Sequence, residues 1–562
     1  MANKIVSEDY ADIIVQNRYL NRYTAAIDAV PLNSRVSMIN VPISEIDMCS
    51  ISEYSYRAFP FLNVMESTLS LNESRIPNVQ NQSNLALFGG GVLVAIIDTG
   101  IDYLHQAFRN ADNTSCIHSI WDQTINEEAE IQEANNNTIR YGKEFTRDMI
   151  NKALSSTNPL EIVPTRDEAG HGTAIAGIIA GRENFESEFR GVVPLADLVV
   201  VKLKQAKKIN KKMFSIPEDV ICYQDTDVIL GINYVREQAE LLNRPLAICI
   251  ALGSNQGSHD GRGILSTYLS EIADTPGMCV VISAGNEGNG RRHHFGLLEG
   301  GTQYSEFEVR VGKDEGGFAM EIWKDASSRV SVDITSPTGE YIKPIFPTLD
   351  RCVRQSLIFS NTIVWVNNNL IENYSGAQLV LIRMDMPSEG LWKFRVYNLD
   401  NKTTNYHVWL PSEGIITDDT YFIDPNPDTT ITSPGNSFYS LTITAYNHLN
   451  NSIYYTASRG LTRNGELKPD LAAPGVEITC PIAYAGYGTA TGTGVAAAHA
   501  TGITAMLLEW GIVRGNNVDL DGYGIKSMLI RGARREPDDS VNNIWGYGRI
   551  DAYGVFEALT LG

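Results

Sequence analysis

The sequence predicts an α/β fold in which a doubly wound parallel sheet is interrupted by an antiparallel β-sandwich. Strand-length runs that are apolar on both faces, such as residues 92–97, alternate with helix-like stretches such as 227–242. That alternation is typical of a parallel sheet covered by helices on both sides. Between about residues 300 and 430 the apolar residues instead recur at every second position, as in 318–322, which indicates antiparallel strands.

Composition narrows the class of protein before any motif is considered. The chain has 562 residues, of which 43% are hydrophobic and 20% are charged. This excludes collagen-like, coiled-coil and wholly disordered proteins and leaves a globular chain with a large core. The net charge of −21 disfavours nonspecific binding to nucleic acid or to anionic membranes. We therefore expect neither nucleic acid nor a membrane as a partner, and the charge says little more.

Cysteine usage and the N-terminal residues indicate the compartment. The seven cysteines are scattered without metal-ligand spacing, and Cys249 and Cys279 lie in apolar strand-like runs as small buried hydrophobes. Glu8, Asp9 and Asp12 interrupt any signal-peptide core. The apolar runs are far shorter than the ~20 residues that a membrane span needs. We expect a reducing, cytoplasmic compartment.

Four parts follow one another along the chain. Residues 1–82 form a first segment with short strand-like runs, and the stretch 72–84, rich in Asn, Ser and Gln, is typical of a linker. The α/β pattern occupies 83–295 and returns over 434–562. The antiparallel strands of 296–433 therefore form an insertion, which we expect to be a jelly roll.

Two motifs place polar side chains where elements begin or end. Residues 96–102 (Ile-Ile-Asp-Thr-Gly-Ile-Asp) put Asp98 at the end of a buried strand, where the fold can hold it rigidly. Residues 170–181 open a helix of small residues with His171 between two glycines, and a histidine there can act as a general base near neutral pH. Taken singly, these residues could equally be a turn-forming Asp and a structural His.

Two further motifs have the same character. Residues 283–289 (Ser-Ala-Gly-Asn-Glu-Gly-Asn) follow a buried strand, and the amide of Asn286 could donate to an oxyanion. Residues 491–502 form a Gly/Thr turn that opens a second helix of small residues.

In this order, the four motifs resemble the subtilisin-like serine proteases, in which Asp, His and Ser follow one another along the chain. The resemblance covers about 83–295 and 434–562. It implies that Asp98 orients the histidine, that His171 is the general base and that Asn286 is the oxyanion donor. The resemblance also implies that the substrate or partner is a protein or peptide, which an active member of the family cleaves as a serine-type endopeptidase.

The family's substrate-binding Ser-Leu-Gly corresponds here to Ala251, Leu252 and Gly253. Pairing of this strand with an extended peptide uses the backbone, so the change from Ser to Ala should not prevent it.

Position 494 departs from the family pattern. The family motif Gly-Thr-Ser is Gly492, Thr493 and Gly494 in this chain, so the nucleophile position holds no hydroxyl and cannot form an acyl-enzyme. Loss of the nucleophile from such a triad lowers turnover by about 10⁶. Two explanations stay open: a natural pseudoprotease, or an active endopeptidase that carries a Ser-to-Gly change. Ala251 and Ala498 also depart from the pattern, which favours the pseudoprotease.

Three features resemble the Csp proteins of clostridial spore germination. They are the insertion between Asn286 and position 494, the short N-terminal segment, and the stretch 102–112. This resemblance implies that residues 1–82 are a propeptide and that the protein is cytoplasmic or spore-associated and acts in germination signalling. Without a nucleophile the propeptide should stay attached, with its end near 72–84 in the cleft as a self-inhibitor.

No cofactor and no metal site is predicted. Adjacent histidines rarely converge on one ion, so we interpret His293 and His294 as part of a solvated loop. We find no carboxylate spacing that supports a calcium site.

Overall fold

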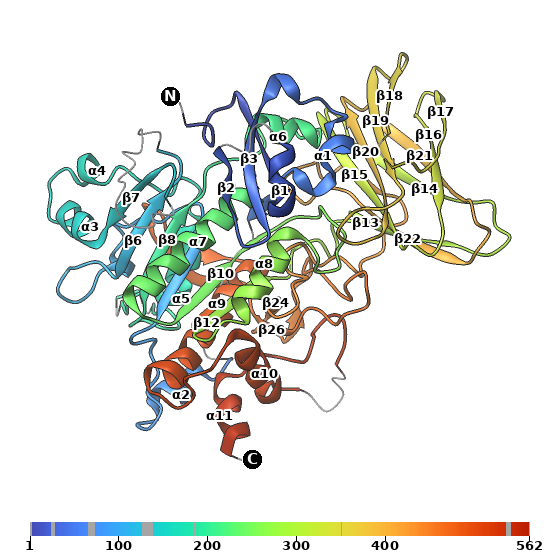
Figure 1. The fold of residues 1–562 in the computed structure, drawn as a ribbon. Helices are drawn as coiled ribbons and strands as arrows, with labels where there is room; N and C mark the ends of the chain where they lie inside the picture. The colour runs from blue at the N-terminus through green and yellow to red at the C-terminus, as the bar shows by residue number, and fades with distance from the viewer. Residues whose placement is uncertain are drawn as a thin grey trace.

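The computed structural model describes residues 3–23, 28–65, 73–125, 139–184, 186–187, 189–349, 351–535 and 541–560. Figure 1 shows a helix-covered sheet on one side, a β-sandwich on the other, and the strands of the N-terminal segment lying between them. The α/β fold with an inserted antiparallel domain, predicted from the sequence, is confirmed.

The central sheet has nine strands in the order β25-β24-β12-β10-β5-β8-β6-β7, with β26 also paired to β24. Its interior pairs are parallel, and antiparallel pairs occur only at the two edges, β24 with β25 and β6 with β7. The strands are β5 (Leu93–Asp98), β6 (Ile117–Asp122), β7 (Lys143–Thr146), β8 (Asp197–Lys202), β10 (Leu246–Ile250), β12 (Met278–Ser283), β24 (Leu441–Asn447), β25 (Ser452–Ile453) and β26 (Leu471–Pro474).

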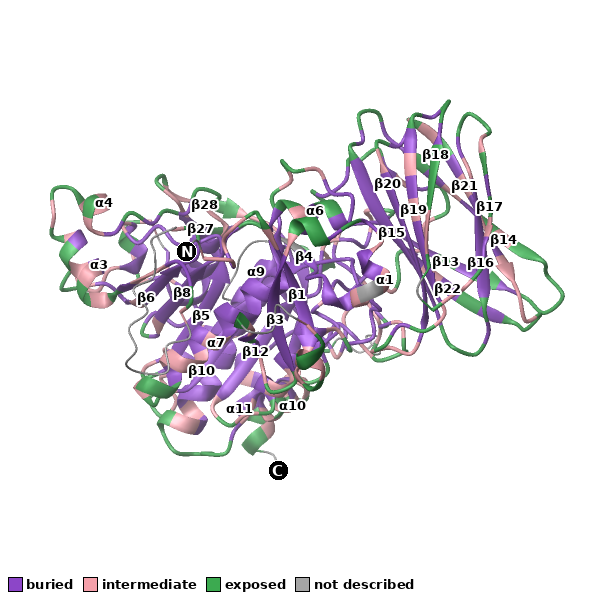
Figure 2. Ribbon diagram, turned by 45° about the horizontal axis from the view of Figure 1, so that its top comes forward, coloured by how far each residue is buried: buried purple, intermediate pink, exposed green. Residues whose placement is uncertain are grey.

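The interior strands of the central sheet are mostly apolar on both faces, because helices cover both sides of the sheet. In β5, Val94 and Ile96 pack with one set of helices, whereas Leu93, Ala95 and Ile97 pack with the other. The first set is α5 (His171–Ala180) and α9 (Thr493–Leu508); the second is α7 (Asp225–Leu242) and α8 (Ile264–Ala273). Figure 2 shows strands β5, β8 and β10 and helix α9 almost entirely in the colour of buried residues. The same part of the chain also contains α3 (Arg147–Leu154), α4 (Pro159–Ile162), α6 (Lys208–Met213), α10 (Gly522–Gly532) and α11 (Ala552–Thr560).

The insertion consists of two antiparallel sheets whose apolar faces share one core. Alternation places Phe318, Met320 and Ile322 in that core. One sheet has the order β13 (His293–Leu298), β22 (Thr404–Trp409), β15 (Gly317–Lys324), β20 (Gln378–Asp385), β19 (Thr362–Asn369), β18 (Cys352–Leu357). The other has the order β17 (Tyr341–Ile345), β16 (Val330–Thr335), β21 (Gly390–Asn398), β14 (Tyr304–Val311), β23 (Tyr421–Phe422). The finer assignment to a jelly roll stays a prediction.

The N-terminal segment forms a three-stranded antiparallel sheet of β1 (Tyr10–Gln16), β3 (Val36–Pro42) and β2 (Val30–Pro31). Both of its faces are covered. Ile13 and Ile39 pack with the core of the sandwich, whereas Ile14 and Met38 pack with the helix side of the central sheet. The segment therefore lies between the two larger parts and contacts both. It continues through α1 (Ser50–Tyr54) to β4 (Leu62–Met65).

The stretch 72–84, predicted to be a linker, is corrected by the structure. It contains helix α2 (Ile76–Asn81), in which Ile76 and Val79 are fully buried in the core beneath α5 and α9. The prediction weighted the Asn- and Ser-rich composition of the stretch and overlooked two apolar residues at helical spacing. The domain boundaries 1–82, 83–295, 296–433 and 434–562 stay a prediction.

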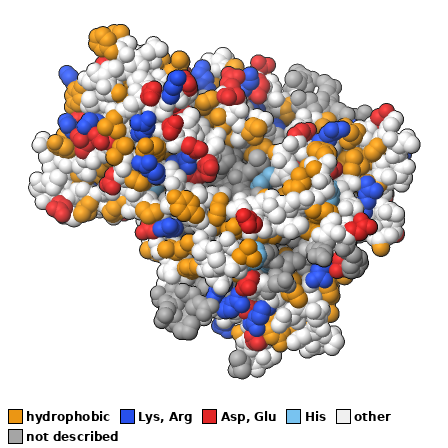
Figure 3. Space-filling view, turned by 180° about the vertical axis from the view of Figure 1, so that it is seen from behind, with side chains coloured by type: hydrophobic (Ala, Val, Ile, Leu, Met, Phe, Trp, Pro, Cys, Tyr) orange, Lys and Arg blue, Asp and Glu red, His pale blue; other side chains and the backbone are white. Residues whose placement is uncertain are grey.

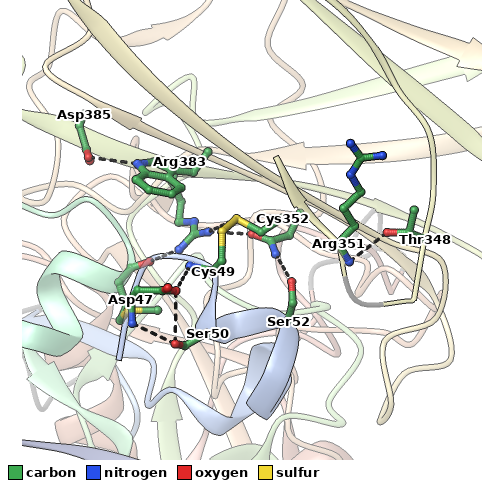
Figure 4. The surroundings of a disulfide bond; sticks show 12 residues. Asp47, Cys49, Ser50, Ser52, Thr348, Arg351, Cys352, Arg383 and Asp385 are labelled. Carbon is green, nitrogen blue, oxygen red and sulfur yellow. Dashed lines mark hydrogen bonds between the residues drawn. A yellow bond between two sulfur atoms is a disulfide. The ribbon is translucent and has the colours of Figure 1, made fainter. Parts of the chain in front are cut away.

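A disulfide joins the N-terminal segment to the sandwich. Cys49, directly before α1, is bonded to Cys352 at the start of β18, although the two lie 303 residues apart in sequence. Figure 4 shows the bond beside the guanidinium of Arg383. The other five cysteines are free and buried, as predicted for Cys249 and Cys279.

Acidic, basic and apolar side chains are interspersed on the face of the molecule shown in Figure 3. Within the described residues, one helical stretch, Thr493–Val513, has the length and hydropathy of a membrane span, and 89% of its most apolar window is buried inside the protein.

The disulfide should stabilise the fold because it restricts the unfolded chain. We expect dithiothreitol to lower the free energy of unfolding by about 2–5 kcal/mol in the unmodified chain, and to have no such effect on the Cys49→Ser/Cys352→Ser double variant. Thiol titration of the denatured, unreduced chain should find five free thiols. Seven free thiols would contradict the pairing.

His499 on α9 should make stability depend on pH. Its ring is buried, Nε2 lies 2.9 Å from Ser74 Oγ, and burial lowers its pKa to about 3. Between about pH 6 and pH 4 the unfolded chain binds a proton here that the folded chain does not, so acidification favours unfolding by about 1.4 kcal/mol per pH unit. His499→Gln should flatten the pH dependence of urea unfolding by that amount. An unchanged slope would sink the assignment.

Candidate active site

Asp98 and His171, predicted as acid and base, lie in direct contact. Asp98 ends β5 and His171 is the first residue of α5, and the imidazole Nδ1 is 2.7 and 2.9 Å from the two carboxylate oxygens. The Asp98 carboxylate also accepts the backbone N–H of Thr99 at 2.7 Å. The side chains are 1% and 8% exposed. A carboxylate in this position fixes the imidazole tautomer with its proton on Nδ1.

The glycines around His171 are required by the backbone. Gly170 is the residue before the helix and has φ of +77°, a conformation that favours glycine. A Cβ on Gly172 would lie 2.1 Å from the carbonyl oxygen of Gly100, so any larger residue would push α5 away from the end of β5. The Gly-His-Gly sequence therefore sets the approach of the histidine to Asp98.

Asp167 is a site residue that the sequence analysis missed. Its buried carboxylate accepts hydrogen bonds from the Thr99 hydroxyl at 2.7 Å, from Gly170 N at 2.9 Å and from Thr173 N and Oγ1 at 2.8 and 2.6 Å. It thereby ties the turn after β5 to the start of α5. An Asp a few residues before a helix start was the available signal, since such residues commonly satisfy the first N–H groups of a helix.

Asn286 and position 494 meet at the start of α9. The side-chain oxygen Oδ1 of Asn286 accepts hydrogen bonds from Thr493 N at 3.1 Å and from Thr493 Oγ1 at 3.2 Å. This leaves the amide nitrogen of Asn286 as the end that can donate. Gly494 is the second residue of α9 and is buried, and α9 packs directly against α5. The structure thus joins Asp98 to His171 and Asn286 to Thr493, the residue before position 494, and α5 and α9, which begin at His171 and Thr493, pack against each other.

The predicted substrate strand is already paired within the chain. Leu252 and Gly253 form the short strand β11, which pairs antiparallel with β4 of the N-terminal segment in the register Leu252↔Met65 and Gly253↔Val64. Ala251 precedes them and is buried. On its other edge β4 pairs with β9 (Tyr223–Gln224).

This pairing corrects the position expected for the self-inhibiting segment. Residues 73–84 do not pair with β11; they lie against the C-terminal part of the chain, where Arg75 binds Asp551 at 2.6 Å and Ser74 contacts His499. Residue 72 lies outside the described residues.

The cysteines offer no replacement nucleophile. Cys249 lies in β10 and Cys480 in β27 (Ile478–Ile482), which forms a hairpin with β28 (Gly486–Ala490). Both thiols are buried, and burial raises the pKa of each to about 12. A thiol with such a pKa forms almost no thiolate at neutral pH and is a poor nucleophile.

No group of three or more His, Cys, Asp or Glu side chains that could hold a metal ion occurs among the described residues. The interpretation of His293 and His294 as a solvated loop is wrong: both lie in β13 and are buried. His293 stacks on Trp409 and His294 on Phe307, so they are core residues of the sandwich.

Comparison with known sequences agrees with this geometry. The sequence model of the subtilase family matches residues 89–305 and 404–548. The chain is 22% identical over 268 residues to subtilisin of Bacillus sp. (strain TA39), covering 47% of this chain and 51% of that protein. It is 22% identical over 446 residues to the C5a peptidase of Streptococcus pyogenes serotype M1, covering 75% of this chain and 34% of that protein. The chain thus matches about half and a third of the length of these relatives.

The solved structure of the Clostridium perfringens CspB protease aligns with a TM-score of 0.76 and 29% identity, covering 87% of this chain and 98% of that one. The residues matched by the family model include Asp98, His171, Asn286 and position 494. The gap between the two matched ranges lies within the sandwich. On this evidence, the chain belongs to the subtilase family and resembles its Csp-type branch in both sequence and fold.

Proposed function

We propose that this chain is a catalytically inactive subtilase whose substrate cleft holds its own N-terminal segment, and that it acts by binding a protein partner. Glycine at position 494 carries the proposal, because the serine mechanism needs a hydroxyl at the start of α9. The Asp98–His171 pair can accept a proton, but no group at position 494 supplies one. The resemblance to Csp proteins supports a role in germination signalling.

Neighbouring hydroxyls do not substitute for the missing one. Thr493 Oγ1 donates to Asn286 Oδ1 at 3.2 Å and accepts from Gly285 N at 3.1 Å. It therefore serves the oxyanion residue and the loop that carries it. Without a nucleophile, the oxyanion donor and the cleft would accelerate peptide hydrolysis by about 10³–10⁴ over the uncatalysed reaction in water. That rate is far below the turnover of a working protease.

The occupied cleft supports the second half of the proposal. β4 belongs to the same chain as β11, so their pairing is intramolecular and does not depend on the protein concentration. Two strands, β9 and β11, hold it at its two edges. A subtilase that cannot cleave keeps this segment in place.

Restoring the hydroxyl should restore self-cleavage. Gly494 has helical backbone geometry, which serine can adopt. We expect Gly494→Ser to cut the chain between Met65 and Glu73, the residues that join β4 to the C-terminal contacts. Intact-mass spectrometry should give two fragments after reduction and one disulfide-linked species before it. Gly494→Ser/His171→Ala is the matched control and should stay whole. An uncut Gly494→Ser chain that melts normally would show that more than the hydroxyl is missing.

The unmodified chain should not react with a serine-directed probe. We expect no labelling by a fluorophosphonate and no turnover of peptide substrates, because the probe needs an activated hydroxyl. Gly494→Ser should be labelled, and Gly494→Ala should not be. Stoichiometric labelling of the unmodified chain would overturn the proposal in favour of an active endopeptidase.

A further inference from the structure

A cavity lies at the seam where the three parts of the molecule meet. Its volume is about 540 Å³, within the range of small-molecule sites. The end of β1 and the start of β3 form one wall, helix α8 and the loop before it form another, and Tyr374 in the loop after β19 forms the third. Figure 1 shows β1, β3 and α8 near the centre of the molecule. The lining residues that matter here are Arg18, Arg35, Val36, Arg262, Ile264, Glu271 and Tyr374.

The charge of this cavity is opposite to that of the chain. Arg18, Arg35 and Arg262 line it against one carboxylate, that of Glu271, whereas the whole chain carries a net charge of −21. Asn17, Gln16, Asn33 and Thr267 add hydrogen-bonding groups. Basic side chains concentrated in a concave site raise the local concentration of anions.

Buried contacts hold two of the walls in place. Arg57 is buried and pairs with Glu372 at 3.2 Å, and its guanidinium lies over the ring of Tyr374 with its carbon 4.9 Å from the ring centroid. Arg57 also donates to the carbonyl oxygen of Arg262. The positions of Tyr374 and Arg262 are therefore set before any ligand binds, which lowers the entropic cost of binding.

The contacts that hold the side chains of Arg18 and Arg35 are exposed, so a ligand can replace them. Arg35 contacts Glu271 at 3.1 Å, but the two side chains are 69% and 34% exposed, and exposed pairs contribute little. Arg18 is held by Gln16 at 2.7 Å. Guanidinium groups match carboxylate and phosphate oxygens in a bidentate geometry.

We propose that this cavity binds a small organic anion that carries two negative charges, as carboxylate or phosphate groups, on an apolar body. The arginines would take the oxyanions, and Val36, Ile264 and Tyr374 would pack against the body. The volume suits a small molecule rather than a long peptide. Because each wall comes from a different part of the chain, such a ligand stabilises the docking of the N-terminal segment on α8 and on the sandwich.

Calorimetric titration of the full chain tests this site with phthalate and with phenyl phosphate. We expect at least one of these dianions to bind with a Kd of about 1 mM or tighter, and benzyl alcohol, which lacks the charge, not to bind. Binding should weaken at least tenfold in Arg18→Gln/Arg262→Gln. Arg310→Gln, an exposed arginine on β14, is the matched control and should bind like the unmodified chain.

Three outcomes would overturn the proposal. The first is no binding of either dianion to the unmodified chain. The second is equal binding by Arg18→Gln/Arg262→Gln with an unchanged melting temperature. The third is binding of polyglutamate without binding of either dianion, which would assign the surface to an acidic macromolecule. None of these readouts depends on position 494, so the result is separate from the proposed loss of proteolysis.

Discussion

Buried ion pairs make the N-terminal segment part of the fold. Lys207 Nζ lies 2.7 Å from the carboxylate of Asp12 in β1, and Arg57 pairs with Glu372 at 3.2 Å; all four side chains are at most 2% exposed. Breaking one such pair while its partner stays buried costs about 3–5 kcal/mol. Burial lowers the pKa of Lys207, and the neighbouring Asp12 carboxylate opposes that shift by stabilising the charged ammonium. Both pairs cross between the N-terminal segment and another part of the molecule, so the segment cannot leave without exposing its partners.

The same reasoning bears on why Asp98 and His171 remain in a chain without a nucleophile. Asp98 accepts a backbone N–H from Thr99 as well as the imidazole, and Asp167 joins Thr99, Gly170 and Thr173 into one network. Replacing Asp98 would leave a buried imidazole and a backbone N–H without an acceptor, at about 1–3 kcal/mol for each group. These contacts give the acid–base pair a structural role of its own, so its presence is no argument for catalysis.

Sequence was a good guide wherever the determinant is local. Apolar runs predicted the central strands. The Gly-His-Gly motif predicted the position of His171, because the local backbone requires glycine at positions 170 and 172. Long-range partners were not predictable. Nothing near Cys49 points to Cys352, and the pairing of β4 with β11 depends on how two distant segments are brought together. His293 is buried because its ring stacks on Trp409 and His407, contacts that the adjacent pair of histidines does not reveal.

The occupied cleft determines where a partner could bind. An external peptide would have to displace β4, which is paired on both edges and tied to the fold upstream by Arg57 and by the Cys49–Cys352 disulfide. Displacing β4 would break its backbone pairing with β11 and β9. A free peptide could replace that pairing only at a concentration above the effective concentration of β4 at β11. Even a cut after β4 would leave β4 seated. We infer that partner binding falls on surfaces outside the cleft, such as the sandwich, and that the cleft contributes to stability instead of recognition.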